Sequence, residues 1–303
     1  MMCFEQRRPV VDDEDIPLPD HAFAGYENLL NRFGDDAARS GLIGETFNVR
    51  LVFLAAISAR LPEPLHVVIT GPRGSGKSYL MDTVARFLPG QYKRVLTGAP
   101  ARELRESGGA RLRHRALFID DCPEYPDCSF PAAFIQTTTC KRLQPEERPG
   151  RLVLAVDESP ERAQAIRMWR EREAAGETLP PDKVIYTRWH RYLLTLKTRE
   201  VVVPCNYWET FPRAISPETL LGLVQASAFL HQYRRHRDGY GRIMAGPEDF
   251  QMVQSLIQKS FRGIWPQPSR ETRPPVQEVR QPVTPAGRGP CLFRRIFGST
   301  TPD

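Results

Sequence analysis

Short apolar runs recur along the first half of the chain, separated by segments long enough for a helix or a loop. The clearest are LHVVIT at 65–70, RALFIDD at 115–121, AAFIQTTT at 132–139 and RLVLAV at 151–156. Continuous apolar runs of this length are typical of parallel strands that are buried on both faces. The segment FNVRLVFLAAISAR at 47–60 instead predicts a buried helix that ends before two prolines. The pattern therefore predicts an α/β protein with a parallel sheet core.

Beyond residue 157 the pattern becomes helical and more strongly charged. The expected elements are helices at 159–176, 180–197, 216–237 and 246–261, with a short extended segment at 199–204. The helix at 216–237 has the clearest start, with Ser216 as N-cap, Pro217 in the first position and Glu218 in the first turn. These elements predict a helical lid after the sheet.

The two ends of the chain have a different composition from its middle. The first residues are polar and contain prolines, and the last are rich in proline without any periodicity, which is typical of disorder. The predicted organisation is a flexible arm at 1–25, an α/β core at 26–157, a helical lid domain at 158–262 and a Pro-rich disordered tail at 263–303.

The overall charge bears on the expected partner of the protein, and the cysteines bear on its redox compartment. The chain has 42 Lys and Arg against 36 Asp and Glu, a net charge of +6. This balance favours an anionic partner such as nucleic acid only weakly, and a mildly basic enzyme without a polymer partner stays an alternative. Six cysteines without a CxxC pair are expected to be free thiols in a reducing compartment.

Membrane and export signals are not expected. The N-terminus is acidic and has no apolar core, which argues against a signal peptide. The longest apolar stretch, at 51–57, is too short to span a bilayer. A cytoplasmic protein with no membrane partner is therefore expected.

The strongest motif directly follows the first predicted strand. GPRGSGKS at 71–78 matches the pattern GxxxxGK[ST] in full, and a helical pattern follows it. Glycines let such a loop point its backbone N–H groups at phosphates, Lys77 is expected to reach the β- and γ-phosphates, and the Ser78 hydroxyl is expected to bind Mg²⁺. The motif predicts a P-loop NTPase that uses ATP and Mg²⁺. The predicted nucleotide-binding residues are Gly71, Pro72, Arg73, Gly74, Ser75, Gly76, Lys77, Ser78 and Tyr79.

Acidic residues follow the second predicted strand. ALFIDD places Asp120 at the end of a buried run, where it is expected to hold Mg²⁺ through water. Asp121 is expected to polarise the attacking water. Its side chain is one methylene shorter than the Glu found in many such ATPases, so hydrolysis is expected to be slow or assisted by Glu124. A strand-to-turn junction without catalytic role is the alternative for both aspartates.

Two further candidates come from the third and fourth predicted strands. One of Thr138, Thr139 or Cys140 is expected to contact the γ-phosphate or the water, and Thr139 is our choice for the catalytic set. The alternative is a run of β-branched strand residues without a role. Arg148 and Arg151 come at or before the start of the fourth strand, and either is a candidate arginine finger for a neighbouring subunit. A solvated surface arginine is the alternative.

Taken in order, these segments resemble the AAA-plus superfamily, and within it the minichromosome-maintenance-type helicases and the helicase-like ATPases that accompany DNA primases on replicons and mobile elements. The resemblance is carried by LIGETFNVRLVFLAAISARLPEPLHVVITGPRGSGKSYLMDTVARFLP, RALFIDD, TTT, LVLAVDESPERAQAI, LLGLVQASAFLHQYRR and MAGPEDFQMVQSLI. It implies an ATPase core with a C-terminal helical lid, a homo-oligomer, and ATP-driven movement or loading on DNA. A primase or another replication protein is an implied partner. It also implies that Arg151 is the finger and Arg213 the cis sensor arginine.

Three features depart from that family. The acidic motif is Asp-Asp, Cys140 replaces the expected Asn, and the segment at 122–136 is short where helicase-like relatives carry DNA-contacting hairpins. The short segment argues against duplex unwinding more than against ATP binding. A regulatory or remodelling ATPase that acts on a protein partner is therefore the alternative function. A small-molecule kinase is disfavoured by the long helical part.

Basic and aromatic residues occur together in the second half. RMWRER, YTRWHRY and HQYRRHR combine arginines that can neutralise phosphates with aromatic rings that can stack on bases. Trp169 and Trp189 lie at helical spacing and are expected in the core. The candidate DNA contacts are Arg188, Arg191, Arg234 and Arg235.

Overall fold

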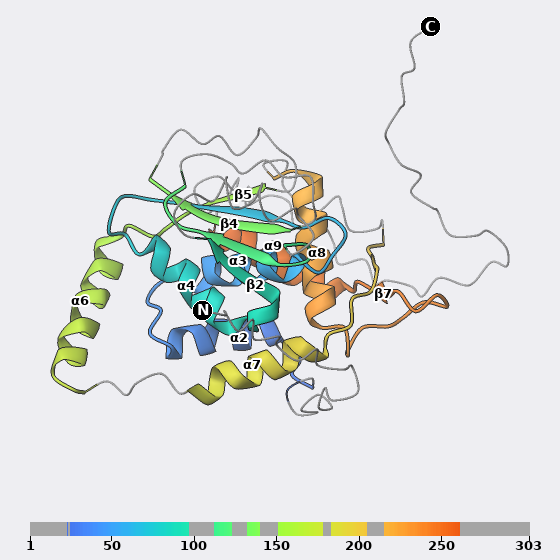
Figure 1. Ribbon diagram of the computed structural model, residues 1–303, viewed down its shortest axis with the longest axis horizontal. Helices are drawn as coiled ribbons and strands as arrows, with labels where there is room; N and C mark the ends of the chain where they lie inside the picture. The colour runs from blue at the N-terminus through green and yellow to red at the C-terminus, as the bar shows by residue number, and fades with distance from the viewer. Residues whose placement is uncertain are drawn as a thin grey trace, which may run out of the picture. The chain divides into compact units, whose positions relative to one another are not determined.

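The computed structural model describes residues 23, 25–96, 112–122, 132–139, 151–177, 183–204 and 215–260. Within these ranges the chain forms a five-stranded sheet, a two-stranded sheet and seven α-helices (Figure 1). The predicted α/β class with a parallel sheet is confirmed.

The large sheet is parallel throughout and its strand order differs from the chain order. The strands are β1 (His66–Thr70), β2 (Lys93–Leu96), β3 (Ala116–Ile119), β4 (Ala133–Thr138) and β5 (Arg151–Ala155). Their order across the sheet is β2-β3-β4-β1-β5. In register, Val67 of β1 pairs with Ile135 of β4 on one side and with Leu152 of β5 on the other. The strand that precedes the glycine-rich motif is therefore separated from β3 by one inserted strand.

Burial on both faces explains why the strands appear as continuous apolar runs. In β3, Ala116 and Phe118 join the main core, whereas Leu117 and Ile119 belong to a second apolar cluster. In β4 the same alternation separates Ile135 from Phe134. Successive side chains of a strand point to opposite faces, so a strand without a polar alternation must be covered on both sides.

The helices are built around α3. The described helices are α2 (Leu29–Arg39), α3 (Thr46–Ser58), α4 (Lys77–Phe87), α6 (Pro160–Ala174), α7 (Lys183–Thr195), α8 (Pro217–Leu230) and α9 (Pro247–Ser260). Nine of the thirteen residues of α3 are buried, because it packs on the sheet and also contacts α2, α8 and α9. A helix that is apolar on all sides is expected at such a central position.

An aromatic cluster ties α7 to this core. Trp189 is fully buried, contacts the rings of Phe33 and Phe53 edge-on, and donates its indole N–H to Asp36 at 3.0 Å. The expectation that Trp189 is a core residue is confirmed. Asp36 also accepts from Arg32 at 3.0 Å, so the buried carboxylate is partnered.

The helical second half shares its core with the sheet. Buried residues of α7, α8 and α9 belong to the same apolar cluster as those of β1 and α3, and all described residues fall within one unit, Met1–Trp265. The expected boundary at residue 157 therefore does not separate two hydrophobic cores. The short extended segment is β6 (Val201–Val202), which pairs with β7 (Ile243–Met244).

Three local features differ from the sequence predictions. The helix expected at 216–237 ends at Leu230. Beyond it the chain turns, and Arg235 forms an ion pair with the buried Asp249 of α9 at 2.7 Å. Helix α2 and strand β2 were not predicted. Gly34 and paired aspartates weaken the helical pattern of α2, and the KRVL segment of β2 is short and half exposed.

Candidate functional site

The polar candidates from different strands meet at one edge of the sheet. The loop at 71–76 follows β1, Asp120 follows β3, and Thr137 lies near the end of β4. Since the strands are parallel, their carboxyl ends share an edge, and β4 lies between β1 and β3. The sheet topology therefore brings the predicted loop and the predicted acidic residue together.

The loop at 71–76 depends on its glycines. Gly74 and Gly76 have φ angles of 79° and 92°, a region that side-chain-bearing residues rarely adopt. A Cβ atom on Gly71 would lie 2.5 Å from Cγ2 of Val156. Ser75 closes the turn by donating its N–H to the carbonyl of Pro72 at 3.2 Å. The loop curls tightly and leads directly into α4 at Lys77.

Lys77 places a positive charge against this loop. Its ammonium group donates to the carbonyls of Gly71 at 2.9 Å and Pro72 at 2.7 Å, and only 7% of the residue is exposed. The N-terminal end of α4 adds the positive end of a helix dipole at the same place. The loop and the helix together form a site that favours anions.

A hydrogen-bonded cluster joins the loop to β3 and β4. Ser78 donates its hydroxyl proton to Oδ1 of Asp120 at 2.8 Å, and Thr137 donates to the same oxygen. Thr137 in turn accepts the backbone N–H of Asp121 at 2.8 Å. The structure thus brings together the two predicted metal ligands, Ser78 and Asp120. Thr137 was not among the predicted residues, because the prediction favoured the later residues of the TTT run.

The residues after the strand ends lie beside this cluster. Asp121 is exposed and has a φ of 48°, a left-handed conformation that Asp tolerates better than most residues. Thr139 follows β4 and is also exposed. Asp82 lies one turn beyond Ser78 on α4, and partial burial together with the Asp120 carboxylate raises its pKa, while Arg86 opposes the shift. Burial is the main cause of this pKa shift, and the Asp120 carboxylate adds to it.

A cavity of about 620 Å³ opens between the loop, residues 41–43 and α6. Its apolar wall includes Ile43, Ile166 and Trp169, and its rim carries Arg73, Arg167 and Arg170. Trp169 is half-buried, and its ring lies close to Gly41. The expectation that Trp169 belongs to the core was wrong: α6 packs only its first turn closely, so the ring faces the cavity. Tyr79 lines the same cavity and donates to the carbonyl of Ser40 at 3.4 Å.

A buried arginine connects the loop with α6. Arg162 donates to the carbonyls of Ser75 at 3.0 Å, Asp157 at 2.7 Å and Ile43 at 3.0 Å, and pairs with Glu45 at 3.3 Å. Both side chains of the pair are buried. Glu45 also accepts the N–H of Asp157 at 2.9 Å. This pair was not predicted, although both residues lie in the segments that carry the family resemblance.

Arg151 lies away from the other catalytic candidates. It opens β5 and pairs in register with His66 of β1, so it lies at the amino-terminal edge of the sheet. A five-residue strand separates the two edges by roughly 16 Å. Burial, and then the nearby Arg151, lower the pKa of His66 to about 4, and its ring accepts the N–H of Phe134 at 3.2 Å. Arg151 could therefore act on a site of this kind only in another copy of the chain.

Several predicted residues fall outside the described ranges. They are Glu124, Cys140, Arg148 and Arg213, together with most of the arm at 1–25 and the whole tail at 263–303. Their predicted roles stay predictions.

The four candidate DNA-contacting arginines separate into two groups. Arg188 and Arg191 are exposed on α7, and Arg234 is exposed while donating to the carbonyl of Gly25 at 2.8 Å. Arg235 is different, because both of its donating nitrogens bind the buried Asp249, at 2.7 and 2.8 Å. Its guanidinium supports the α8–α9 packing, which argues against a DNA contact.

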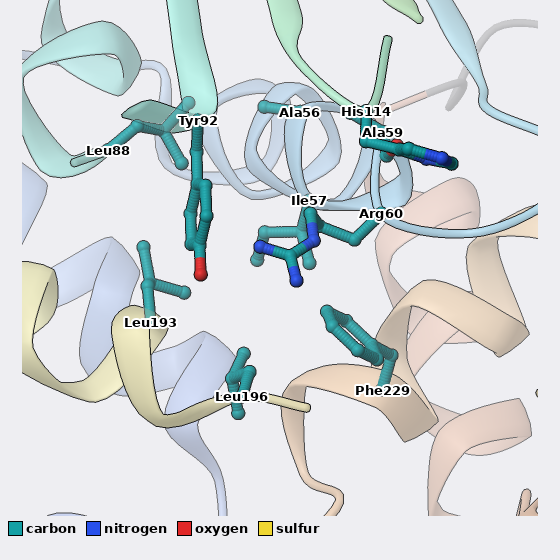
Figure 2. A pocket seen from close by; sticks show the side chains of 10 residues that line it. All are labelled: Ala56, Ile57, Ala59, Arg60, Leu88, Tyr92, His114, Leu193, Leu196 and Phe229. Carbon is teal, nitrogen blue, oxygen red and sulfur yellow. The ribbon is translucent and has the colours of Figure 1, made fainter. Parts of the chain in front are cut away.

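A second, much smaller hollow lies where α3, α7 and α8 meet (Figure 2). Its volume is about 10 Å³, enough for roughly one water molecule. Figure 2 shows the Arg60 side chain reaching across it, with Tyr92 on one side and Phe229 on the other. The guanidinium lies 4.3 Å from the centre of the Tyr92 ring and binds the hydroxyl of Thr198. The hollow is too small for a ligand, and it carries no functional candidate.

The chain matches no protein-family model and no curated protein. In the parts of the chain that the structure describes, every helix is too short or too polar to cross a bilayer. The assignment of a function therefore rests on the geometry of the site and on the resemblance of its segments to the AAA-plus superfamily.

Proposed function

We propose that this protein is a P-loop ATPase of the AAA-plus type that binds and hydrolyses Mg-ATP at the 71–78 loop. The observation that carries the proposal is the hydrogen bond of 2.8 Å between Ser78, at the start of α4, and Asp120, at the end of β3. Two oxygen ligands from distant segments meet beside an anion-favouring loop, as a Mg–triphosphate complex requires. Strand β4, which lies between β1 and β3, also supports the proposal, because AAA-plus ATPases carry an additional strand at this place in the sheet.

The residues at 71–78 and Asp120 suit the binding of Mg-ATP. Backbone N–H groups of residues 71–76 and the ammonium of Lys77 would bind the phosphates, and Ser78 and Asp120 would hold Mg²⁺. Bound there, Mg²⁺ would neutralise charge on the phosphate oxygens. Hydrogen bonds to two loop carbonyls hold the Lys77 ammonium against the loop, and the bond to Asp120 holds the Ser78 hydroxyl beside the end of β3.

The neighbouring cavity has room for the rest of a nucleotide. A volume of about 620 Å³ lies within the usual range for small-molecule sites. Its aromatic and aliphatic wall, Trp169 with Ile43 and Ile166, suits a base, and the arginines on its rim suit phosphates. Tyr79 lies where it would border the ribose or base.

Hydrolysis would need a group that orients water. Asp121 and Thr139 are both exposed beside the Asp120 cluster, and Glu124 is a further candidate. Arg151 would complete the site from a neighbouring copy, and Arg213 would act as the sensor within the chain. This arrangement predicts a homo-oligomer as the active form.

We further propose that the ATPase is a motor or loader on nucleic acid, in DNA replication, as the resemblance implies. Its support in this chain is the exposed Arg188 and Arg191 on α7 and the net charge of +6. ATPase turnover should then rise with single-stranded DNA, and the rise should disappear at high salt. Turnover that ignores DNA and RNA but responds to a protein would favour the remodelling alternative.

The site is tested with Lys77→Ala and Asp120→Asn. Lys77→Ala should lower ATP affinity strongly and abolish hydrolysis while the protein stays folded. Asp120→Asn should abolish the Mg²⁺ dependence of binding and stop turnover. Lys197→Ala, an exposed lysine outside the site, is the matched control and should behave as the wild type. Wild-type turnover in Lys77→Ala would overturn the proposal.

A further inference from the structure

A tight loop with an exposed aromatic ring at its tip follows α8. Arg237 and Ile243 form an antiparallel bridge that closes it, and the loop lies beside β7 (Figure 1). Asp238 holds it together: its carboxylate accepts the N–H groups of Tyr240 at 3.0 Å and Arg242 at 2.9 Å. Its backbone N–H donates to the carbonyl of Arg242 at 3.1 Å. The loop therefore has a fixed shape.

That fixed shape keeps Tyr240 in solvent. The residue is 86% exposed, more than any other large hydrophobic residue in the described ranges. The Arg242 guanidinium lies 5.3 Å from the ring centre and is itself held by Asp238 at 2.6 Å. A bonded loop that presents an aromatic ring with a cation behind it has one ring face available for stacking.

Basic residues lie close to the ring. Arg234 and Arg237 are exposed and precede it in the chain, and Arg199 donates to the carbonyl of Gly241 at 3.3 Å. The acidic Asp238 is bound by Arg242, and the exposed Glu200 lies 3.8 Å from the same guanidinium. An aromatic platform among cations is the combination that binds single strands, because a base offers its face and the adjoining phosphates offer negative charge.

We infer that the loop at 237–243 is a contact site for single-stranded nucleic acid, with Tyr240 stacking on a base and Arg237 contacting a neighbouring phosphate. Duplex DNA does not fit the ring, since its base faces are covered by stacking. The inference rests on the proposal that this ATPase acts on nucleic acid, and it names the surface by which it does so.

The test measures binding of the full chain to a fluorescein-labelled oligo(dT) by anisotropy, with and without Mg-ATP. Tyr240→Ala should weaken binding about tenfold, as expected for one lost stacking contact. Tyr240→Phe keeps the ring and should bind as the wild type. Arg237→Gln should weaken binding and lower the slope of affinity against salt by about 0.7, the value for one phosphate contact on a single strand.

Tyr26→Ala is the matched control. Tyr26 is also exposed and also has an arginine over its ring, Arg32 at 5.4 Å, but it lies before α2. Its removal should leave DNA affinity unchanged. Wild-type affinity in Tyr240→Ala would overturn this inference and leave the nucleic-acid proposal intact. No binding by the wild-type chain in either nucleotide state would overturn both, whereas the ATP site is judged separately by Lys77→Ala.

Discussion

Helices α6 and α8 have the same three residues at their start, but one helix is mostly exposed and the other is mostly buried. Each starts at Ser-Pro-Glu, and the cap residues Ser159 and Ser216 have nearly identical backbone angles. Both serine hydroxyls accept the N–H three residues on, at 3.3 and 3.2 Å. Yet ten residues of α8 are buried, whereas Arg162 is the one residue of α6 that is buried.

The difference shows that a cap decides where a helix begins and the remaining residues decide what it contacts. After its cap, α8 continues as TLLGLVQASAFL and fits against α3, while α6 continues as RAQAIRMWREREA and borders the cavity. One helix therefore holds the fold together and the other forms a wall of the candidate site. Substitutions on the two helices can test that division.

Shortening a side chain of α8 should lower the free energy of unfolding far more than shortening a side chain of α6. Phe229 is buried, so Phe229→Ala should lower the free energy of unfolding by about 3–5 kcal/mol. Met168 on α6 is 55% exposed, and Met168→Ala should change it by no more than about 0.5 kcal/mol. Urea unfolding followed by circular dichroism measures both. Similar losses for the two variants would contradict the division.

Arg162 should be the exception within α6. Arg162→Ala leaves the buried Glu45 without its partner and should cost about 3 kcal/mol, while also weakening nucleotide binding through the Ser75 carbonyl. The control is Arg172→Ala on the same helix, whose pair with Glu177 is exposed and should cost less than about 1 kcal/mol. Adding Glu45→Gln to Arg162→Ala should restore part of the stability.

Trp169 should affect binding without affecting stability. Trp169→Ala removes part of the cavity wall and should weaken nucleotide affinity about tenfold, with Trp169→Phe close to the wild type. Trp189→Phe should lower the free energy of unfolding and leave nucleotide affinity unchanged, because it opens the core and leaves Asp36 without the indole donor. Calorimetric titration with a non-hydrolysable ATP analogue, compared with thermal unfolding, separates the two effects. Unchanged nucleotide affinity in Trp169→Ala would show that the base does not bind in this cavity.

The two caps should give the smallest and most closely matched effects. Ser159→Ala and Ser216→Ala each remove one capping bond, worth about 1 kcal/mol. In α8 the loss should lower global stability, whereas in α6 it should appear as faster hydrogen exchange confined to that helix. Exchange measured by mass spectrometry distinguishes the outcomes. Equal global destabilisation would mean that α6 is as firmly attached as α8.

Much of the sheet could be predicted, because strands that are buried on both faces consist mainly of apolar residues. The runs at 65–70, 115–121, 132–139 and 151–156 each contain an observed strand. The strand order and the edge strand β2 could not be obtained in this way, since KRVL has one buried residue and no apolar run. Helix α2 was missed for a similar reason, because its apolar residues are interrupted by glycine and acidic residues.

Some residues of the candidate site could also be predicted from the sequence, and others could not. The loop, Ser78 and Asp120 follow from a local pattern and from the rule that parallel strands end at one edge. Thr137, Arg162 and Glu45 act through contacts between segments far apart in the chain, which one sequence does not reveal. Trp169 was misplaced because helical spacing identifies an apolar position but not the element that covers it.

The central place of β1 has a consequence for how the chain acquires its shape during synthesis. Its two hydrogen-bonded neighbours, Ala133–Thr138 and Arg151–Ala155, leave the ribosome long after His66–Thr70. The burial of α3 is completed only when Pro217–Leu230 and Pro247–Ser260 have followed. Distant pairings of this kind form slowly. Until then part of the apolar surface of α3 stays uncovered, so a nascent chain that stops short of β5 presents an aggregation-prone surface of the kind that chaperones bind.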